Sequence, residues 1–246
     1  MAVEWRDEGV LLSARPHGES AAVIEVLTAA HGRHAGVVPG GASRRMAPVL
    51  QPGAQLDLVW RARLDAHIGT FRAEPLGARA ASLMGDRRAL AGLGSVCALC
   101  LFALPERATC PDFYHRTGAL LDAMAAGPGW EGAYLNWELR FLEEVGLGLD
   151  LSGCAVLGHA ANDLSYVSPR TGRAVSRAGA GAWADRLLPL PACLIGGGAP
   201  SAEDLMQGLA LTGHFLHHHL APQLGDRPMP QARARLVARL ALRPTP

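Results

Sequence analysis

The sequence predicts an α+β multidomain protein in which a five-stranded β-barrel precedes an all-α domain that a turn-rich insertion interrupts. Three observations predict this fold class: short β-rich segments fill the first 77 residues, apolar residues at helical spacing follow from about Ala78, and Gly, Ser and Pro concentrate between residues 146 and 198. A chain of 246 residues is also long for one domain. We expect a barrel domain over residues 1–77, a helical domain in two parts (residues 78–150 and 200–246), and the insertion at residues 151–199.

The barrel is predicted from five short segments that are β-branched or alternate between apolar and polar residues. They cover residues 10–12, 22–27, 36–38, 55–60 and 67–73. Turn signals rich in Gly and Pro separate them. Five short strands in this length suit a closed barrel, because closure removes exposed sheet edges. An OB-like barrel is one candidate, and an SH3-like barrel is another.

The helices are predicted from apolar residues that recur on one face. One apolar face consists of Leu120, Leu121 and Met124, and a second consists of Leu135, Leu139, Leu142 and Val145. The acidic residues expected to face solvent are Glu131, Glu138 and Glu143. Another helix should begin near Ala202, where Ser201 and Asp204 have the spacing of a capping box. A last helix is expected over residues 230–242, because Pro suits a first helical turn.

The composition excludes several classes of protein. With 49% apolar residues, 18% charged residues and a mean hydropathy of +0.13, the chain is folded rather than disordered. Its net charge of +1 excludes attraction of the whole molecule to nucleic acid or anionic lipid, so any polyanion site must be local. The longest run without charged residues or histidine, residues 89–105, is shorter than the roughly 20 residues of a membrane helix, and no membrane partner is expected. Five scattered cysteines and a start without a secretory signal predict a reducing cytoplasm.

Common enzyme signatures are missing or lie in the wrong context. Residues 127–132 match a dinucleotide fingerprint as letters, but a helix rather than a strand is expected before them, and a loop between two helices is the preferred interpretation. All 23 basic residues are arginine, so a phosphate loop of the lysine type cannot exist. A Gly-x-Ser-x-Gly elbow is also missing from the sequence.

Histidines and cysteines leave one enzymatic alternative open. His214, His217, His218 and His219 form a cluster, and the first and third would share a helix face at a spacing that can hold a metal. This pattern indicates either a metal-dependent hydrolase or, more simply, a polar helix face. The pair Cys97-x-x-Cys100 has metal-knuckle spacing but lies in an apolar run, so buried helix cysteines are expected.

The arginines are concentrated in two places. Between residues 28 and 63, five arginines stand against one acid; they are Arg33, Arg44, Arg45, Arg61 and Arg63. Residues 227–246 hold five more and no acid, namely Arg227, Arg233, Arg235, Arg239 and Arg243. A charged groove on such a barrel would bind single-stranded nucleic acid mainly through its backbone, since Trp60 and Phe71 are the only candidate stacking platforms there. An ordinary solvated surface, or a scaffold that binds only protein, is the alternative.

The order of several motifs resembles a known family. These motifs are WRDEGVLL at residues 5–12, GESA at 18–21, residues 32–38 with GGASR at 40–44, WELRFLEEVGLG at 137–148, and YVSP at 166–169 followed by Gly172. Together they resemble the bacterial recombination mediator RecO, a family of DNA repair proteins. The resemblance covers nearly the whole chain and implies an N-terminal OB domain, a helical core built from both sides of the insertion, and, in some members, a zinc-knuckle module.

The insertion departs from the zinc-knuckle pattern. A Cys-x-x-Cys pair would begin at Cys154, but position 157 is Leu, and residues 175–179 contain no cysteine. One thiolate cannot hold structural zinc. We therefore expect a zinc-less, degenerate knuckle, with no metal and no cofactor in the protein.

The resemblance also implies a non-enzymatic activity and its partners. It implies binding of single- and double-stranded DNA, annealing of complementary strands, and help in loading a recombinase onto DNA covered by single-strand DNA-binding protein, in a cytoplasmic, nucleoid-associated location. RecR and the acidic C-terminal tail of the single-strand DNA-binding protein would be the protein partners. The DNA contacts expected in the barrel are Arg33, His34, Arg44, Arg45, Arg61, Arg63 and Arg72, with the C-terminal arginines as a second cluster. Arg116 and Arg140 are the candidates for docking the tail.

Overall fold

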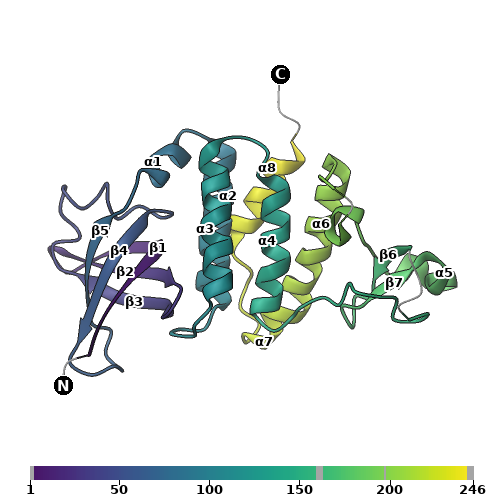
Figure 1. Cartoon of the computed structure of the whole chain (residues 1–246), viewed down its shortest axis with the longest axis horizontal. Coiled ribbons are helices and arrows are strands. Elements are labelled where there is room, and N and C mark those ends of the chain that lie inside the picture. The colour runs from purple at the N-terminus through teal and green to yellow at the C-terminus, as the bar shows by residue number, and fades with distance from the viewer. Residues whose placement is uncertain (1–2, 159–162, 197, 243–246) are drawn as a thin grey trace. The chain divides into compact units, whose positions relative to one another are not determined.

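The computed structural model describes residues 3–158, 163–196 and 198–242 (Figure 1). The chain divides into two compact units, Met1–Pro128 and Gly129–Pro246. This division falls inside the stretch 78–150 that the sequence predicts as the first part of a helical domain, and the predicted domain boundaries remain predictions. Within the described ranges, none of the helices is both long enough and apolar enough to cross a membrane.

The first unit begins with a closed five-stranded barrel, as expected for an OB-like domain. Its strands are β1 (Val3–His17), β2 (Ala21–Thr28), β3 (Gly32–Val38), β4 (Gln55–Ala62) and β5 (Thr70–Pro75). Their order around the barrel is β1-β2-β3-β5-β4, and all neighbours are antiparallel except β3 and β5, which meet in parallel at Val37 and Thr70. The register shift between Leu11 and Ser13 lets the long first strand bend and pair on both of its edges.

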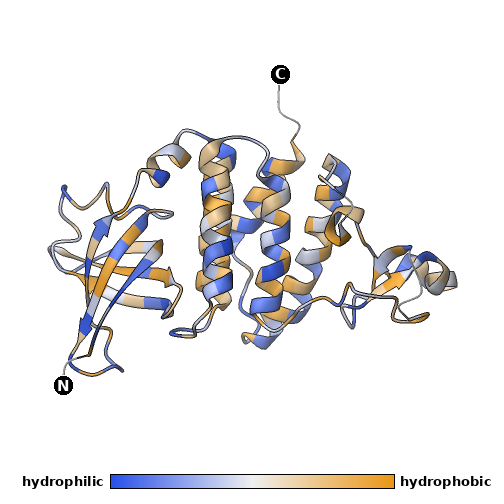
Figure 2. Ribbon diagram, in the orientation of Figure 1, coloured by the Kyte–Doolittle hydropathy of each residue, from blue (hydrophilic) through white to orange (hydrophobic). Residues whose placement is uncertain are grey.

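Apolar side chains from alternate positions of each strand fill the barrel. Inward residues of successive strands are apolar, and hydrophobic and hydrophilic residues alternate along the strands in Figure 2. Trp60 and Phe71 belong to this core, with 0% and 2% of their surfaces exposed, so the expectation that they offer stacking platforms is wrong. Gly69 has φ +66°, and a Cβ there would lie 2.4 Å from Nε1 of Trp60, so only glycine lets the chain pass the indole.

Three helices complete the first unit: α1 (Arg79–Met84), α2 (Arg87–Ala103) and α3 (Pro111–Ala126). The side-chain amide of Gln55 on β4 donates a hydrogen bond of 2.7 Å to the hydroxyl of Tyr114 on α3. Cys97 and Cys100 are buried in α2, as predicted, and burial raises the pKa of Cys97 to about 12. These thiols are therefore inert parts of the helical packing.

The second unit contains α4 (Glu131–Glu144), α6 (Ala202–Phe215), a π-helix (Leu216–Leu220), α7 (Ala221–Gln223) and α8 (Gln231–Ala241). Residues 127–130 form the predicted loop before α4. The predicted capping box is present: the backbone N–H of Asp204 donates to the Ser201 hydroxyl at 3.1 Å, and the backbone N–H of Ser201 donates to the Asp204 carboxylate at 3.0 Å.

Glu138 is buried, so the prediction that it faces solvent is wrong. Its carboxylate is fully buried and accepts hydrogen bonds from Nε and Nη2 of Arg233, at 2.8 and 2.7 Å, and from the hydroxyls of Tyr134 and Thr212. The guanidinium of Arg233 also donates to the carbonyl of Leu209 at 2.7 Å. Two charges can share the interior here because each finds several partners.

The insertion forms a small module with its own sheet. Strands β6 (Leu164–Val167), β7 (Ala174–Ser176) and β8 (Leu188–Pro189) pair in the order β7-β6-β8, and α5 (Arg177–Ala180) leads into a 3₁₀ helix, η1 (Gly181–Arg186). Cys154 lies in the small core with Val175 and Ala180. Its sulfur accepts hydrogen bonds from the backbone N–H and the hydroxyl of Ser176, both at 3.2 Å, which tie the segment at Cys154 to the end of β7.

Candidate nucleic-acid interface

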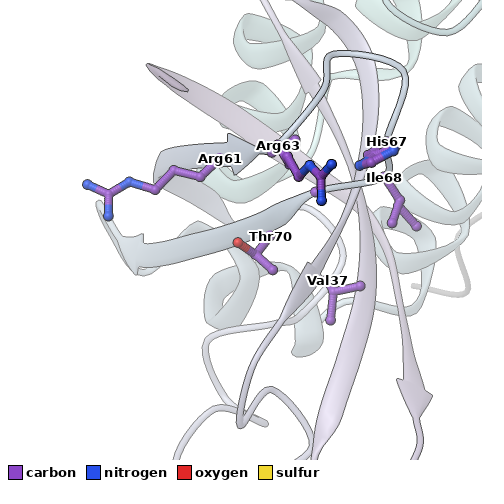
Figure 3. A pocket seen from close by; sticks show the side chains of 8 residues that line it. Val37, Arg61, Arg63, His67, Ile68 and Thr70 are labelled. Carbon is purple, nitrogen blue, oxygen red and sulfur yellow. The ribbon is translucent and has the colours of Figure 1, made fainter. Parts of the chain in front are cut away.

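Two adjoining hollows lie on the outside of the barrel, where β3, β4 and β5 meet. The first, of about 710 Å³, is lined by Val37, residues 61–63 at the end of β4 and residues 67–70 of the β4–β5 connection (Figure 3). The second, of about 600 Å³, shares Arg61 and Thr70 with the first. We call the two together the barrel groove; its remaining lining residues are Glu4, Arg6, Val38, Pro39, Met46, Val59, Phe71, Arg72 and Ala73.

Strand register brings the groove arginines together. Trp60 pairs with Phe71 and both point inward, so their neighbours Arg61 and Arg72 point outward on adjacent strands. Arg63 follows the end of β4 directly and lines the same hollow as Arg61. The structure therefore gathers Arg61, Arg63 and Arg72 at one groove, and it adds Arg6 from β1, which the sequence analysis did not select.

Some of these arginines have carboxylate partners. Arg61 pairs with Glu4 at 2.7 Å, Arg72 with Glu74 at 2.6 Å, and Arg6 with Asp57 at 2.5 Å. The hydrogen bond and charge of Asp57 raise the pKa of Arg6, and the hydrogen bond from Arg6 lowers the pKa of Asp57. Between 67% and 78% of each arginine side chain is exposed, and solvent screens ion pairs at such positions so that they contribute little to stability. A phosphate can therefore compete with these carboxylates.

Arg44 and Arg45 adjoin the groove along the chain, although neither lines it. Both are exposed in the turn that follows Pro39, and Met46, the next residue, lines the groove itself. The turn is fixed by the backbone N–H of Gly41, which donates to the carbonyl of Val38 at 3.0 Å. Over the parts of the chain that the structure describes, no carboxylate pairs with Arg44, Arg45 or Arg63.

Two predicted DNA contacts on β3 are wrong. Only 15% of the Arg33 side chain is exposed, and its guanidinium binds the carboxylate of Glu25 at 2.5 Å and the carbonyl of Leu104 at 2.9 Å. His34 is 2% exposed and packs among Trp5, Trp60 and Phe71, and no described residue forms a hydrogen bond with either ring nitrogen. Burial, followed by the charge of Arg107, lowers the pKa of His34 to about 4, so the ring is neutral at pH 7. Both side chains therefore belong to the internal packing of the first unit.

Arg107 is a positioning residue that the sequence analysis missed. Its guanidinium donates to the carbonyls of Asp65 and His67, the latter at 2.8 Å, and lies 5.6 Å from the centre of the Trp60 ring. It thereby holds the β4–β5 loop, which carries Arg63 and His67 to the groove. No local sequence pattern predicts this role, because the contact joins the α2–α3 connection to a loop 40 residues earlier.

The second arginine cluster is smaller than predicted. Arg235 and Arg239 are exposed on α8 at i, i+4 spacing, and Arg227 is exposed before that helix. Arg233 is not a surface cation, since it is only 7% exposed and pairs with Glu138, and that prediction is wrong. Arg243 lies outside the described residues.

The two residues predicted to dock an acidic tail belong to different compact units. Arg116 is exposed on α3 of the first unit, and Arg140 is exposed on α4 of the second. Arg140 pairs with Glu143 at 2.6 Å, and this hydrogen bond raises the pKa of Arg140. Their role stays a prediction.

The histidines do not form a metal site in the described structure. The π-helix adds a residue to the turn, and as a result Nε2 of His214 and Nε2 of His219 both approach the carbonyl of Pro169, at 3.2 and 2.8 Å. Burial lowers the pKa of His214 and of His217. No group of three or more His, Cys, Asp or Glu residues is arranged to hold a metal ion within residues 3–158, 163–196 and 198–242. The hydrolase alternative therefore has no support.

Comparisons with known proteins identify the family of this chain. Residues 1–79 match the family model "Recombination protein O N terminal", and residues 84–228 match "Recombination protein O C terminal". The chain is 63% identical over 239 residues to the DNA repair protein RecO of Cereibacter sphaeroides, covering 97% of this chain and 99% of that protein. It is 60% identical over 235 residues to the DNA repair protein RecO of Dinoroseobacter shibae, covering 96% of this chain and 97% of that protein. The chain therefore belongs to the RecO family of DNA repair proteins.

Proposed function

We propose that this protein is a non-enzymatic recombination mediator that binds single-stranded DNA along the barrel groove and anneals complementary strands. The observation that carries the proposal is the convergence of Arg61, Arg63 and Arg72 at one groove, with Arg44 and Arg45 adjoining it along the chain. Three of these five side chains, those of Arg44, Arg45 and Arg63, are without a carboxylate partner in the described ranges.

The chemistry of the groove favours the DNA backbone over the bases. Guanidinium groups pair with phosphates in a bidentate manner, whereas Trp60 and Phe71 lie inside the barrel core and Trp5 is partly buried against it. The apolar side chains of Val37 and Ile68 line the first hollow and suit contact with sugar or base edges of any sequence. We therefore expect binding that depends little on sequence and strongly on salt.

Annealing requires that two strands approach while their repulsion is screened. The barrel groove would hold one strand, and the exposed arginines of α8, Arg235 and Arg239, are candidates for screening another strand or a duplex. Recombinase loading, and binding of RecR and of the acidic tail of single-strand DNA-binding protein, complete the proposal. Arg116 and Arg140 remain the candidates for the tail, and the protein would act in the cytoplasm, at the nucleoid.

The proposal is tested with paired double variants. Arg61→Ala/Arg63→Ala removes two groove cations, and Arg87→Ala/Arg116→Ala removes two exposed cations of the same unit that do not line the groove. Fluorescence anisotropy with a labelled single strand should show weaker binding for the first variant only, and annealing of complementary strands should slow in parallel. Equal binding by the two variants, with both still folded, would reject the groove as the DNA site.

A further inference from the structure

The insertion exposes an aromatic side chain that its core does not use. Trp183 in η1 is 61% exposed, although tryptophan is usually largely buried. A 3₁₀ helix has three residues per turn, so Ala184 and Leu187 share one side and pack against the core around Cys154 and Val175. The same period places Trp183 and Arg186 together on another side.

Trp183 and Arg186 form a defined pair. The guanidinium carbon of Arg186 lies 4.8 Å from the centre of the Trp183 ring, which is cation–π geometry. A guanidinium stacked on one side of an indole leaves the ring oriented and its remaining surface open. The pair thus presents a flat aromatic surface next to a fixed positive charge.

The charge of the surrounding module favours a polyanion. Its described stretch 163–196 holds four arginines and two aspartates. Arg173 pairs with Asp150 at 3.3 Å, whereas no carboxylate in the described part of the chain pairs with Arg170, Arg177 or Arg186. An exposed tryptophan among unpaired arginines matches the way proteins bind single strands, in which bases stack on aromatic rings and arginines contact phosphates.

We infer that the insertion carries a second contact for single-stranded DNA, in which a base stacks on the indole of Trp183 and Arg186 binds a neighbouring phosphate. The inference rests on the proposed function, because it takes single-stranded DNA as the ligand, and it adds a site in the second compact unit to the barrel groove in the first. It also assigns base stacking to a module in which the zinc-knuckle positions expected at residue 157 and within residues 175–179 hold no cysteine.

Tryptophan emission tests this directly. Of the other four tryptophans, Trp60, Trp130 and Trp137 are at most 3% exposed, and Trp5 is partly buried. Addition of oligothymidine should therefore quench emission from Trp183, and Trp183→Phe should remove that quenching while retaining most of the affinity. Trp183→Ala should weaken binding about 5- to 150-fold, the range that alanine replacement of a stacking ring produces. Leu157→Ala, which truncates another exposed apolar side chain of the module, should leave the affinity unchanged.

The possible results separate this inference from the proposed function. Salt-sensitive binding that Trp183→Ala leaves unchanged, or the same quenching in Trp183→Phe as in the wild type, overturns the second contact alone. Quenching that survives in Arg61→Ala/Arg63→Ala at higher oligothymidine concentration supports it. Quenching of Trp183 by an aspartate-rich peptide but not by oligothymidine would make the surface a peptide site and overturn the inference. Failure of the wild-type protein to bind oligothymidine would overturn both proposals.

Discussion

The buried ion pair of the second unit provides a stability prediction that can be worked from its contacts. Arg233→Met would remove four hydrogen bonds: two to the carboxylate of Glu138, at 2.8 and 2.7 Å, one to the carbonyl of Leu209 at 2.7 Å, and one to the hydroxyl of Thr212 at 3.4 Å. Glu138 is fully buried and, among the described residues, would keep only the hydroxyls of Tyr134 and Thr212 as partners. Leaving one charge of a buried pair uncompensated costs about 3–5 kcal/mol. We expect a loss of that size in the free energy of unfolding.

Urea unfolding followed by circular dichroism measures this loss. Arg140→Met is the matched control, because it breaks an exposed pair with Glu143 and should cost less than about 1 kcal/mol. The double variant Glu138→Leu/Arg233→Met removes both charges and should recover most of the stability, since apolar replacement of a buried pair is often neutral. A loss below about 1 kcal/mol for Arg233→Met, or no recovery in the double variant, would refute this reasoning.

Three further predictions concern single residues. Burial lowers the pKa of His34 to about 4, below its unfolded value near 6.5, so the free energy of unfolding should fall by up to about 3 kcal/mol as pH drops from 6.5 to 4. Acid unfolding of His34→Phe should lack this pH-dependent loss, and a pH profile equal to that of the wild type would contradict the prediction. Arg107→Ala should accelerate hydrogen exchange of residues 63–69 and weaken single-strand binding, whereas unchanged exchange would show that Arg107 does not hold that loop. Cys154→Ala removes the acceptor for the Ser176 N–H and should cost about 1–3 kcal/mol, with exchange increasing at Ser176 and not in the barrel; exchange that stays unchanged at Ser176 would contradict this role.

The sequence was informative where the signal is periodic and local. Alternation predicted the five barrel strands, and the Ser201-x-x-Asp204 spacing predicted the start of α6. In each case neighbouring residues determine the geometry, so one sequence suffices.

Pairings between distant residues were not predictable in this way. Glu138 looks like a solvent-facing helix residue until Arg233, 95 positions later, is brought beside it. Arg33 and His34 resemble ordinary members of a basic segment, but their surroundings are set by α2 and by the aromatic core of the barrel. Charge counting along the chain therefore overestimated both arginine clusters, because a count does not distinguish an exposed guanidinium from one paired internally.

The central claim is that exposed guanidinium groups at one barrel groove bind the phosphates of a single strand. Its most direct test is the salt dependence of the dissociation constant for oligothymidine. Five contacts, by Arg44, Arg45, Arg61, Arg63 and Arg72, predict a slope of log affinity against log salt of about −3.5, at about −0.7 per contact. Arg61→Ala/Arg63→Ala should make the slope less negative by about 1.4, and Arg87→Ala/Arg116→Ala should leave it unchanged. The same slope in all three proteins would contradict the claim.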